Sequence, residues 1–237
     1  MARAVVTDIE GTTTPLAFVH EVLFPYARER LEGFLGRRGE EPAVRRLLEE
    51  ARALAEEELG RPVAQGELPS VLRRWMDEDR KLTPLKALQG LIWEEGYARG
   101  ELQGQLYEDA ARALRRWREE GLRLYVYSSG SERAQRLLFG HTPYGDLTPL
   151  FAGFFDTRVG PKREAASYRE IARRIGLPPG EILFLSDVEA ELDAAREAGM
   201  ATVRLHREGG PLPPSRHPVV RDFDAIDPRA LAGPGAG

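Results

Sequence analysis

Acidic residues follow the first apolar run of the chain, at Asp8 and Glu10 within 5-VVTDIEGTTTPLAF-18. A β-branched run of this kind is typical of a buried strand, and an open α/β sheet binds ligands at the carboxyl ends of its strands. Asp187 follows the apolar run 182-ILFLS-186 in the same way. Carboxylates that lie close together repel each other and raise each other's pKa, and a bound divalent cation neutralises this repulsion. We expect Mg²⁺, which binds through one or two carboxylates, waters and a substrate phosphate.

A phosphate site is indicated by two further stretches that follow apolar runs. Ser128 and Ser129 precede a predicted helix, and the amides around Gly130 would offer N-terminal donors to a phosphate. Lys162 would add a compact charge for phosphate oxygens or for holding a carboxylate nucleophile, although it could also be a surface charge. A lysine is unusual here, because the 34 basic residues are 31 arginines and three lysines. The group indicates phosphoryl transfer, with Asp8 attacking to form an aspartyl-phosphate.

Several of these residues also have a simpler explanation. Ser128 and Ser129 could cap the following helix, although Ser131 is the better placed cap. Glu189 and Glu191 could bind or support the metal ion, but they also lie in the first turn of a predicted helix, where the helix dipole favours acids in any case. We therefore leave these two glutamates out of the predicted metal site.

The hydrophobic pattern of the sequence changes after Gly100, where predicted strands alternate with predicted helices. These elements must position the candidate site residues. This alternation is typical of a parallel sheet with crossover helices. The tail from Gly209 is rich in proline and glycine, so we expect a loop and a fraying end there. After the first strand, further strands are expected at 122–128, 153–157, 182–186 and 201–206, and helices at 107–121, 131–140, 163–176 and 189–199.

The stretch between the first strand and this alternating part has only helical periodicity. Apolar residues recur every three or four positions, and Pro25 is expected to kink or restart the first helix. We therefore predict an α/β fold with a Rossmann-like core made of residues 1–16 and 100–237, and an all-helical insertion at 17–99. The predicted helices of the insertion are 17–38, 41–59, 67–80 and 84–98.

Composition narrows the classes of function. The 237 residues carry a net charge of −4 with 42% hydrophobic residues, which gives no electrostatic reason to expect a nucleic-acid partner. There is no cysteine, and the four histidines have no metal-site spacing, so zinc is not expected. The N-terminus lacks a signal-peptide pattern, and no apolar run reaches the roughly 18–20 residues that span a bilayer. We expect a cytoplasmic monomer that acts on a small molecule and binds no membrane.

The order of D-x-E-G-T, S-S-G-S, G-P-K-R-E and S-D along the whole chain resembles the haloacid dehalogenase superfamily of phosphohydrolases. The strings DIEGTTTP, FVHEVLFPYARE, LFGHT, GDLTPLFAGFFDT, GPKREAASY and ILFLSDVEAELDAAREAGM are similar to the enolase-phosphatase family of methionine salvage. Most members of the superfamily carry a second aspartate two residues after the nucleophile. This chain has Glu10 there, as that family does.

The resemblance implies a reaction and a set of roles. The family substrate is 2,3-diketo-5-methylthiopentyl-1-phosphate, which is enolised and then dephosphorylated to the acireductone 1,2-dihydroxy-3-keto-5-methylthiopentene. Residues 17–99 would form a helical cap that closes over the site. One Mg²⁺ per subunit would be bound by Asp8, Asp187 and Glu10, the last commonly through its backbone carbonyl, and the phosphate by Ser128, Ser129 and Lys162.

The enolisation step can also be considered chemically. Mg²⁺ and Lys162 near a diketone would stabilise the oxygen that becomes negative when a carbon proton leaves. Glu10 is the leading candidate for the base, and a residue of the cap is the alternative.

Three other functions stay open at this point. The chain could be a plain Mg²⁺-dependent phosphatase of another small phosphorylated metabolite. A dehalogenase is less favoured, because that chemistry needs no metal and no acid at Glu10. A catalytically silent binding protein on the same fold is disfavoured by the presence of Asp8, Glu10, Lys162 and Asp187 together.

Overall fold

The computed structural model describes residues 1–231. The chain divides into two compact units, and the first is built from two separate stretches of sequence. One unit joins Met1–Leu16 to the chain from Gln103 onward, and the other is Ala17–Leu102. The candidate catalytic residues all belong to the first unit.

A six-stranded parallel sheet forms the centre of the first unit, with the order β3-β2-β1-β4-β5-β6. This confirms the predicted α/β class. The strand β1 lies in the middle, with β2 on one side and β4 on the other, so the order reverses beside β1. Ligands of open α/β sheets bind at such a switch point. The strands are β1 (Ala4–Thr7), β2 (Arg123–Tyr127), β3 (Phe151–Phe155), β4 (Ile182–Ser186), β5 (Ala201–Leu205) and β6 (Val219–Val220).

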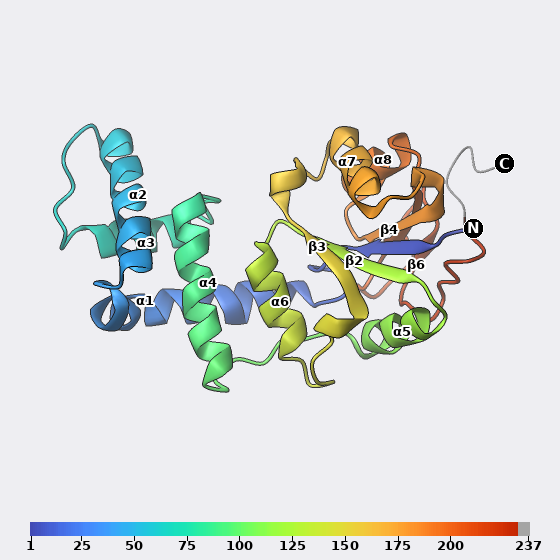
Figure 1. The fold of residues 1–237 in the computed structure, drawn as a ribbon, viewed down its shortest axis with the longest axis horizontal. Coiled ribbons are helices and arrows are strands. Elements are labelled where there is room, and N and C mark those ends of the chain that lie inside the picture. Colours follow the sequence, from blue (N-terminus) through green and yellow to red (C-terminus); the bar gives the residue numbers. More distant parts are fainter. Residues whose placement is uncertain (232–237) are drawn as a thin grey trace. The chain divides into compact units, whose positions relative to one another are not determined.

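Helices cover both faces of this sheet (Figure 1). On one face, alternate residues of the central strands, such as Val6, Tyr127 and Phe184, pack in one core with Tyr168 and Leu192. Residues two apart along a strand point to the same face, which is why alternate positions share this core. The helices are α5 (Glu108–Glu119), α6 (Glu132–Gly140), α7 (Ala165–Ile175) and α8 (Glu189–Glu197), with short 3₁₀ helices at Thr148–Leu150, Thr157–Val159 and Pro179–Glu181.

The C-terminal segment differs from its prediction. The expected loop and fraying end begins at Gly209, but β6 adds a sixth strand beside β5. Phe223 and Ile226 are buried, and Phe223 stacks on Trp117 of α5 with ring centroids 5.5 Å apart. The prediction was wrong for this segment because it relied on the proline and glycine content and disregarded the isolated apolar residues, which form β6 and add to the core. Residues 232–237 of the predicted tail lie outside the described residues.

Helices are the regular secondary structure of the second unit, and loops and turns join them. A π-helical segment (Phe18–Leu23) runs directly into α1 (Phe24–Arg38), and the backbone N–H of Phe24 donates to the carbonyl of Val19. Pro25, which has no backbone N–H to donate, lies at this junction, where the helix changes from π to α geometry. The remaining helices are α2 (Pro42–Leu59), α3 (Leu68–Asp77) and α4 (Thr83–Ala98). Trp75, Phe34 and Leu88 are among the fully buried residues of its core.

Among residues 1–231, no helix combines the length and the apolar character that a membrane crossing requires.

Candidate active site

Asp8 is held at the carboxyl end of the central strand. Its backbone N–H donates to the carbonyl of Leu185 on β4 at 2.9 Å, which extends the β1–β4 pairing by one residue. The side chain is buried, and the backbone N–H of Ile9 donates to its Oδ1 at 2.7 Å. Its Oδ2 has a weaker contact, a hydrogen bond of 3.4 Å from the hydroxyl of Ser186. The less engaged oxygen of Asp8 is therefore Oδ2.

Lys162 brings a buried positive charge to Asp8. Its Nζ lies 2.7 Å from Asp8 Oδ1 and 2.7 Å from Oε2 of Glu191, and its side chain is 11% exposed. Burial alone would lower the pKa of Lys162, but attraction to the two carboxylates raises it above the ordinary value. Lys162 is therefore a charged ammonium that bridges two carboxylates, and not an ordinary surface lysine.

The loop before Lys162 is fixed by side-chain hydroxyls. Tyr127 donates to the carbonyl of Gly160, Ser167 to that of Pro161, and Tyr168 to that of Lys162, at 2.7–2.9 Å. Gly160 has φ +134°, and a Cβ there would lie 2.3 Å from the hydroxyl of Ser167. This loop accepts only glycine at that position without strain, because both the backbone conformation and the space exclude a side chain.

Asp187 comes to the same rim because β4 is the neighbour of β1. Thr12 holds it twice: the backbone N–H of Asp187 donates to Thr12 Oγ1 at 3.1 Å, and Thr12 Oγ1 lies 3.4 Å from Asp187 Oδ1. Gly11 has φ +68°, and a Cβ there would lie 2.3 Å from Asp187 Oδ2. The glycine of the D-x-E-G-T motif thus leaves the space that the Asp187 carboxylate occupies.

The electrostatics of the rim favour a bound cation. Burial, and then the charge of Asp8, raises the pKa of Asp187 to about 6. Burial and Asp8 likewise raise the pKa of Glu191 to about 7, against the opposing effect of Lys162. The charge of Lys162 and the hydroxyl of Thr12 oppose the rise in the pKa of Asp187 but do not cancel it, so negative charge accumulates where Asp187 and Asp8 meet.

The donor set agrees with Mg²⁺. Within the described part of the chain, no three His, Cys, Asp or Glu side chains converge as a metal site of their own. Mg²⁺ does not need such a cage, since it binds through one or two carboxylates and keeps several waters. Asp8 and Asp187 supply two hard oxygen donors on adjacent strands, and Glu10, which is half-buried, follows Asp8 on the same loop. The residues therefore fit this ion.

The predicted phosphate-binding serines differ in their surroundings. Ser128 is buried at the end of β2, and its Oγ accepts from the backbone N–H of Gly130 at 3.2 Å. Ser129 is exposed. Ser131 is the cap of α6, since its Oγ accepts from the backbone N–H of Ala134 at 3.3 Å, which confirms the sequence assignment. The helix is thus capped without Ser128 and Ser129.

The sequence analysis missed two polar side chains at this site. Glu191 is buried against Lys162, and Ser186 donates to Glu191 Oε2 at 3.1 Å. The helix dipole accounted equally well for an acid at position 191. The one sequence signal for a place in the site was that Glu191 follows Asp187 by four residues. Glu189 behaves as assumed: it pairs with Arg204 at 2.9 Å and accepts from Ser215 at 2.9 Å.

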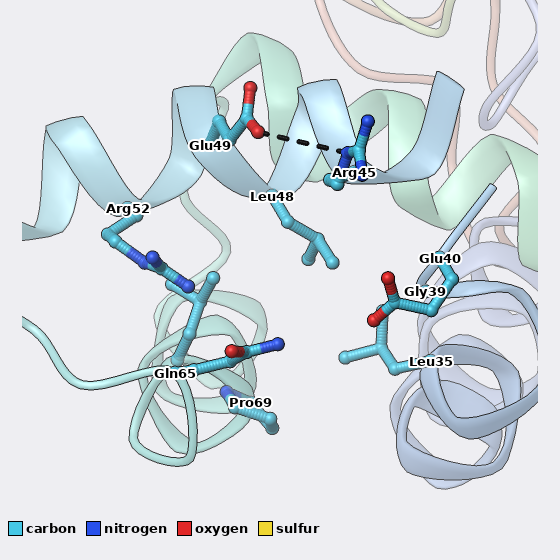
Figure 2. Close-up of a pocket in the computed structure, with 10 residues that line it drawn as sticks. Leu35, Gly39, Glu40, Arg45, Leu48, Glu49, Arg52, Gln65 and Pro69 are labelled. Atoms are coloured by element: carbon cyan, nitrogen blue, oxygen red, sulfur yellow. Dashed lines mark ion pairs between the residues drawn. The ribbon is translucent and has the colours of Figure 1, made fainter. Parts of the chain in front are cut away.

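A pocket of about 440 Å³ in the helical unit has a different chemistry (Figure 2). Its wall carries Leu35 and Leu48, with Arg45 and Glu49 paired at 4.0 Å on α2. It contains no convergent carboxylates and no buried lysine, so it does not resemble the rim at β1 and β4.

Comparisons with known proteins identify the family of this chain. The model of the haloacid dehalogenase-like hydrolases matches residues 2–199. Enolase-phosphatase E1 of Methylococcus capsulatus is 58% identical over 232 residues, with 98% of this chain and 100% of the relative covered. Enolase-phosphatase E1 of Azotobacter vinelandii is 57% identical, with 96% and 98% covered.

Solved structures share the fold of this chain. Unknown transcript 4 protein of Saccharomyces cerevisiae superposes with a TM-score of 0.80 at 32% identity, covering 95% of this chain and 100% of that one. A dehalogenase at 19% identity, covering 94% of each chain, shares the fold with a TM-score of 0.55. The chain belongs to the haloacid dehalogenase-like hydrolases and, within them, to the enolase-phosphatase family.

Proposed function

We propose that this protein is a Mg²⁺-dependent enolase-phosphatase of methionine salvage. It would enolise 2,3-diketo-5-methylthiopentyl-1-phosphate and hydrolyse the phosphate to give the acireductone. The observation that carries the proposal is the buried pair of Asp8 and Lys162, 2.7 Å apart at the end of the central strand. The names of relatives above 50% identity over nearly the full chain support the substrate.

Asp8 is the proposed nucleophile for phosphoryl transfer. Its Oδ1 is held by Lys162 and by the amide of Ile9, which leaves Oδ2 to attack the phosphorus and form an aspartyl-phosphate. The P–O bond to the substrate breaks in the same step, and the released substrate oxygen takes up a proton from water. Water then cleaves the acyl phosphate and regenerates the carboxylate. Ser128 and Ser129 are proposed to bind phosphate oxygens together with Lys162, whose second carboxylate partner, Glu191, keeps its ammonium in place.

Asp8, Asp187 and Glu10 are the proposed ligands of one Mg²⁺. When bound, the ion would supply positive charge for the phosphate oxygens and for the oxygen that becomes negative during enolisation. Asp187 is well suited to this role because Thr12 fixes its backbone and its carboxylate. The raised pKa of Asp187 means that the ion and a proton compete for it.

Glu10 is the proposed base of the enolisation step. It follows the nucleophile on the same loop but is less buried than Asp8, so its carboxylate could reach a substrate carbon. The proton removed from that carbon would be carried by the Glu10 carboxylate, and Lys162 would stabilise the enolate oxygen.

The helical segment 17–99 is the proposed cap that selects the substrate. A cytoplasmic location and a monomeric state remain predictions from the sequence.

One assay tests the proposal most directly. The diketo phosphate is incubated with the protein, with and without Mg²⁺, while phosphate release and absorbance are followed together. We expect both signals with Mg²⁺, because the enol and the acireductone are conjugated, and no phosphate release from Asp8→Asn. Phosphate release from unrelated esters with an inert diketo phosphate would instead indicate a plain phosphatase. Absence of any phosphatase activity in the natural sequence would favour a silent binding protein.

A further inference from the structure

The guanidinium of Arg207, just after β5, is buried against the loop that follows β1. Its side chain is 9% exposed. Nε and Nη2 both donate to the backbone carbonyl of Thr12, at 3.0 and 2.8 Å. Nη1 pairs with the carboxylate of Asp109 at 2.8 Å and donates to the carbonyl of Arg221 at 3.2 Å. This charge therefore connects the start of α5 and the C-terminal segment to the loop that carries the predicted nucleophile.

The surroundings leave Arg207 little freedom. Its Cζ lies 4.1 Å from the ring centroid of Tyr107 and 5.2 Å from that of Phe223, so the guanidinium is flanked by aromatic rings. Asp109 also accepts from the backbone N–H of Phe223 at 2.8 Å, which fixes the carboxylate independently. A planar guanidinium can give two N–H groups to one carbonyl while a third reaches a carboxylate, and an ammonium cannot reproduce this fork.

Thr12 relays this constraint to Asp187. Its carbonyl is fixed by Arg207, while its Oγ1 accepts from the backbone N–H of Asp187 at 3.1 Å and lies 3.4 Å from Asp187 Oδ1. The next residue is tied down as well, because the backbone N–H of Tyr107 donates to the carbonyl of Thr13 at 2.9 Å. Displacement of the Thr12 backbone would therefore displace the Asp187 carboxylate.

We propose that Arg207, oriented by Asp109, is a positioning residue for Mg²⁺ binding, acting through Thr12 on Asp187. The inference rests on the proposed function, in which Asp187 binds the ion. Arg207 touches neither the ion nor the substrate. Its effect is to keep Asp187 in the orientation that Mg²⁺ requires, since this ion tolerates little deviation from octahedral geometry.

The test measures Mg²⁺ affinity without substrate. The thermal unfolding midpoint of the full chain is followed across a Mg²⁺ titration, which gives an apparent Kd because ligand that binds only the folded state raises the midpoint. Loss of a group that holds a metal ligand weakens binding by about 10–100-fold. Arg207 acts through one further residue, so we expect Arg207→Lys to raise the apparent Kd about three- to tenfold and Arg207→Gln more.

Two controls separate the possible outcomes. Arg112→Gln removes another arginine of the same unit. Arg112 and Asp224 form an ion pair whose two side chains are half-exposed, so this substitution should leave the Kd for Mg²⁺ unchanged. Asp187→Asn should abolish the Mg²⁺-dependent rise of the midpoint. If Asp187→Asn has no effect, the proposed metal site is wrong. If Asp187→Asn abolishes the rise but Arg207→Lys keeps the natural Kd, only the inference about Arg207 is wrong.

A purely structural role would give a distinct result. Arg207→Lys and Arg207→Gln would then lower the midpoint in the absence of Mg²⁺ with an unchanged Kd, and this would overturn the proposal. If Arg207→Gln does not fold, Asp109→Asn provides the second variant, because it keeps the shape of the side chain that orients Arg207. A raised Kd in Asp109→Asn supports the proposal, and an unchanged Kd contradicts it.

Discussion

Replacing Lys162 by methionine removes the buried positive charge at the rim while keeping an unbranched apolar side chain. The lysine lies 2.7 Å from Asp8 and 2.7 Å from Glu191, and the three side chains are 6–11% exposed. Removing one partner of a buried ion pair costs about 3–5 kcal/mol, because an uncompensated charge stays behind. Asp8 keeps the hydrogen bond from Ile9, and Glu191 can take up a proton, so we expect about 3 kcal/mol, the lower end of that range.

The measurement is urea unfolding at pH 7.5 without Mg²⁺. Lys81→Met is the matched control, because Lys81 pairs with Asp79 at half-exposed side chains, and loss of such a pair costs about 0–1 kcal/mol. Adding Glu191→Gln to Lys162→Met should recover part of the stability, since the folded protein then no longer has to protonate Glu191. Mg²⁺-dependent phosphate release should be lost in both variants that lack Lys162. Equal free energies of unfolding for Lys162→Met and Lys81→Met would refute the account of a buried charge held by two carboxylates.

Three further predictions concern single positions. Between about pH 5 and pH 7.5 without Mg²⁺, the natural protein should lose stability relative to Glu191→Gln. Burial raises the pKa of Glu191 to about 7, so the folded state binds the proton more tightly than the unfolded state, and this contribution to stability disappears as the pH rises. The same dependence of the melting temperature on pH in both proteins would contradict this. Gly11→Ala should abolish the Mg²⁺-dependent rise of the melting temperature, because its Cβ would lie 2.3 Å from Asp187 Oδ2, and an unaltered Mg²⁺ titration would show that this space is not needed. Phe223→Ala should cost about 3–5 kcal/mol in urea unfolding, whereas Leu212→Ala in the same segment, at an exposed side chain, should change little; similar midpoints would mean that Phe223 is not part of the core.

The parallel sheet was predictable because apolar runs and helical stretches alternate after residue 100, and a parallel sheet requires that alternation. The meeting of Asp8 and Asp187 at one rim follows from the same rule, although the sequence does not give the strand order that makes β1 and β4 neighbours. The C-terminal strand was missed because two residues carry too little periodicity to be recognised.

Other parts of the site depend on side-chain directions that no spacing rule fixes. Glu191 looked like one of many acids in a first helical turn, and only the structure directs it at Lys162. Arg207 was one of 31 arginines, and its burial depends on Asp109, about 100 residues away in sequence. Lys162 could be selected because lysine is rare in this chain, which is a property of composition and not of geometry.

The split construction of the sheet unit sets the order in which the chain can acquire structure during synthesis. The first strand leaves the ribosome early, but its neighbours are Arg123–Tyr127 and Ile182–Ser186 of the 237 residues, so its hydrogen bonds to β2 need about half of the chain and those to β4 need most of it. The helical unit is continuous from Ala17 to Leu102, and its contacts are short in sequence, which favours fast folding. We therefore expect nascent chains to contain a folded helical segment while the apolar β1 still awaits its partners, and this interval is when the emerging polypeptide is most exposed to aggregation.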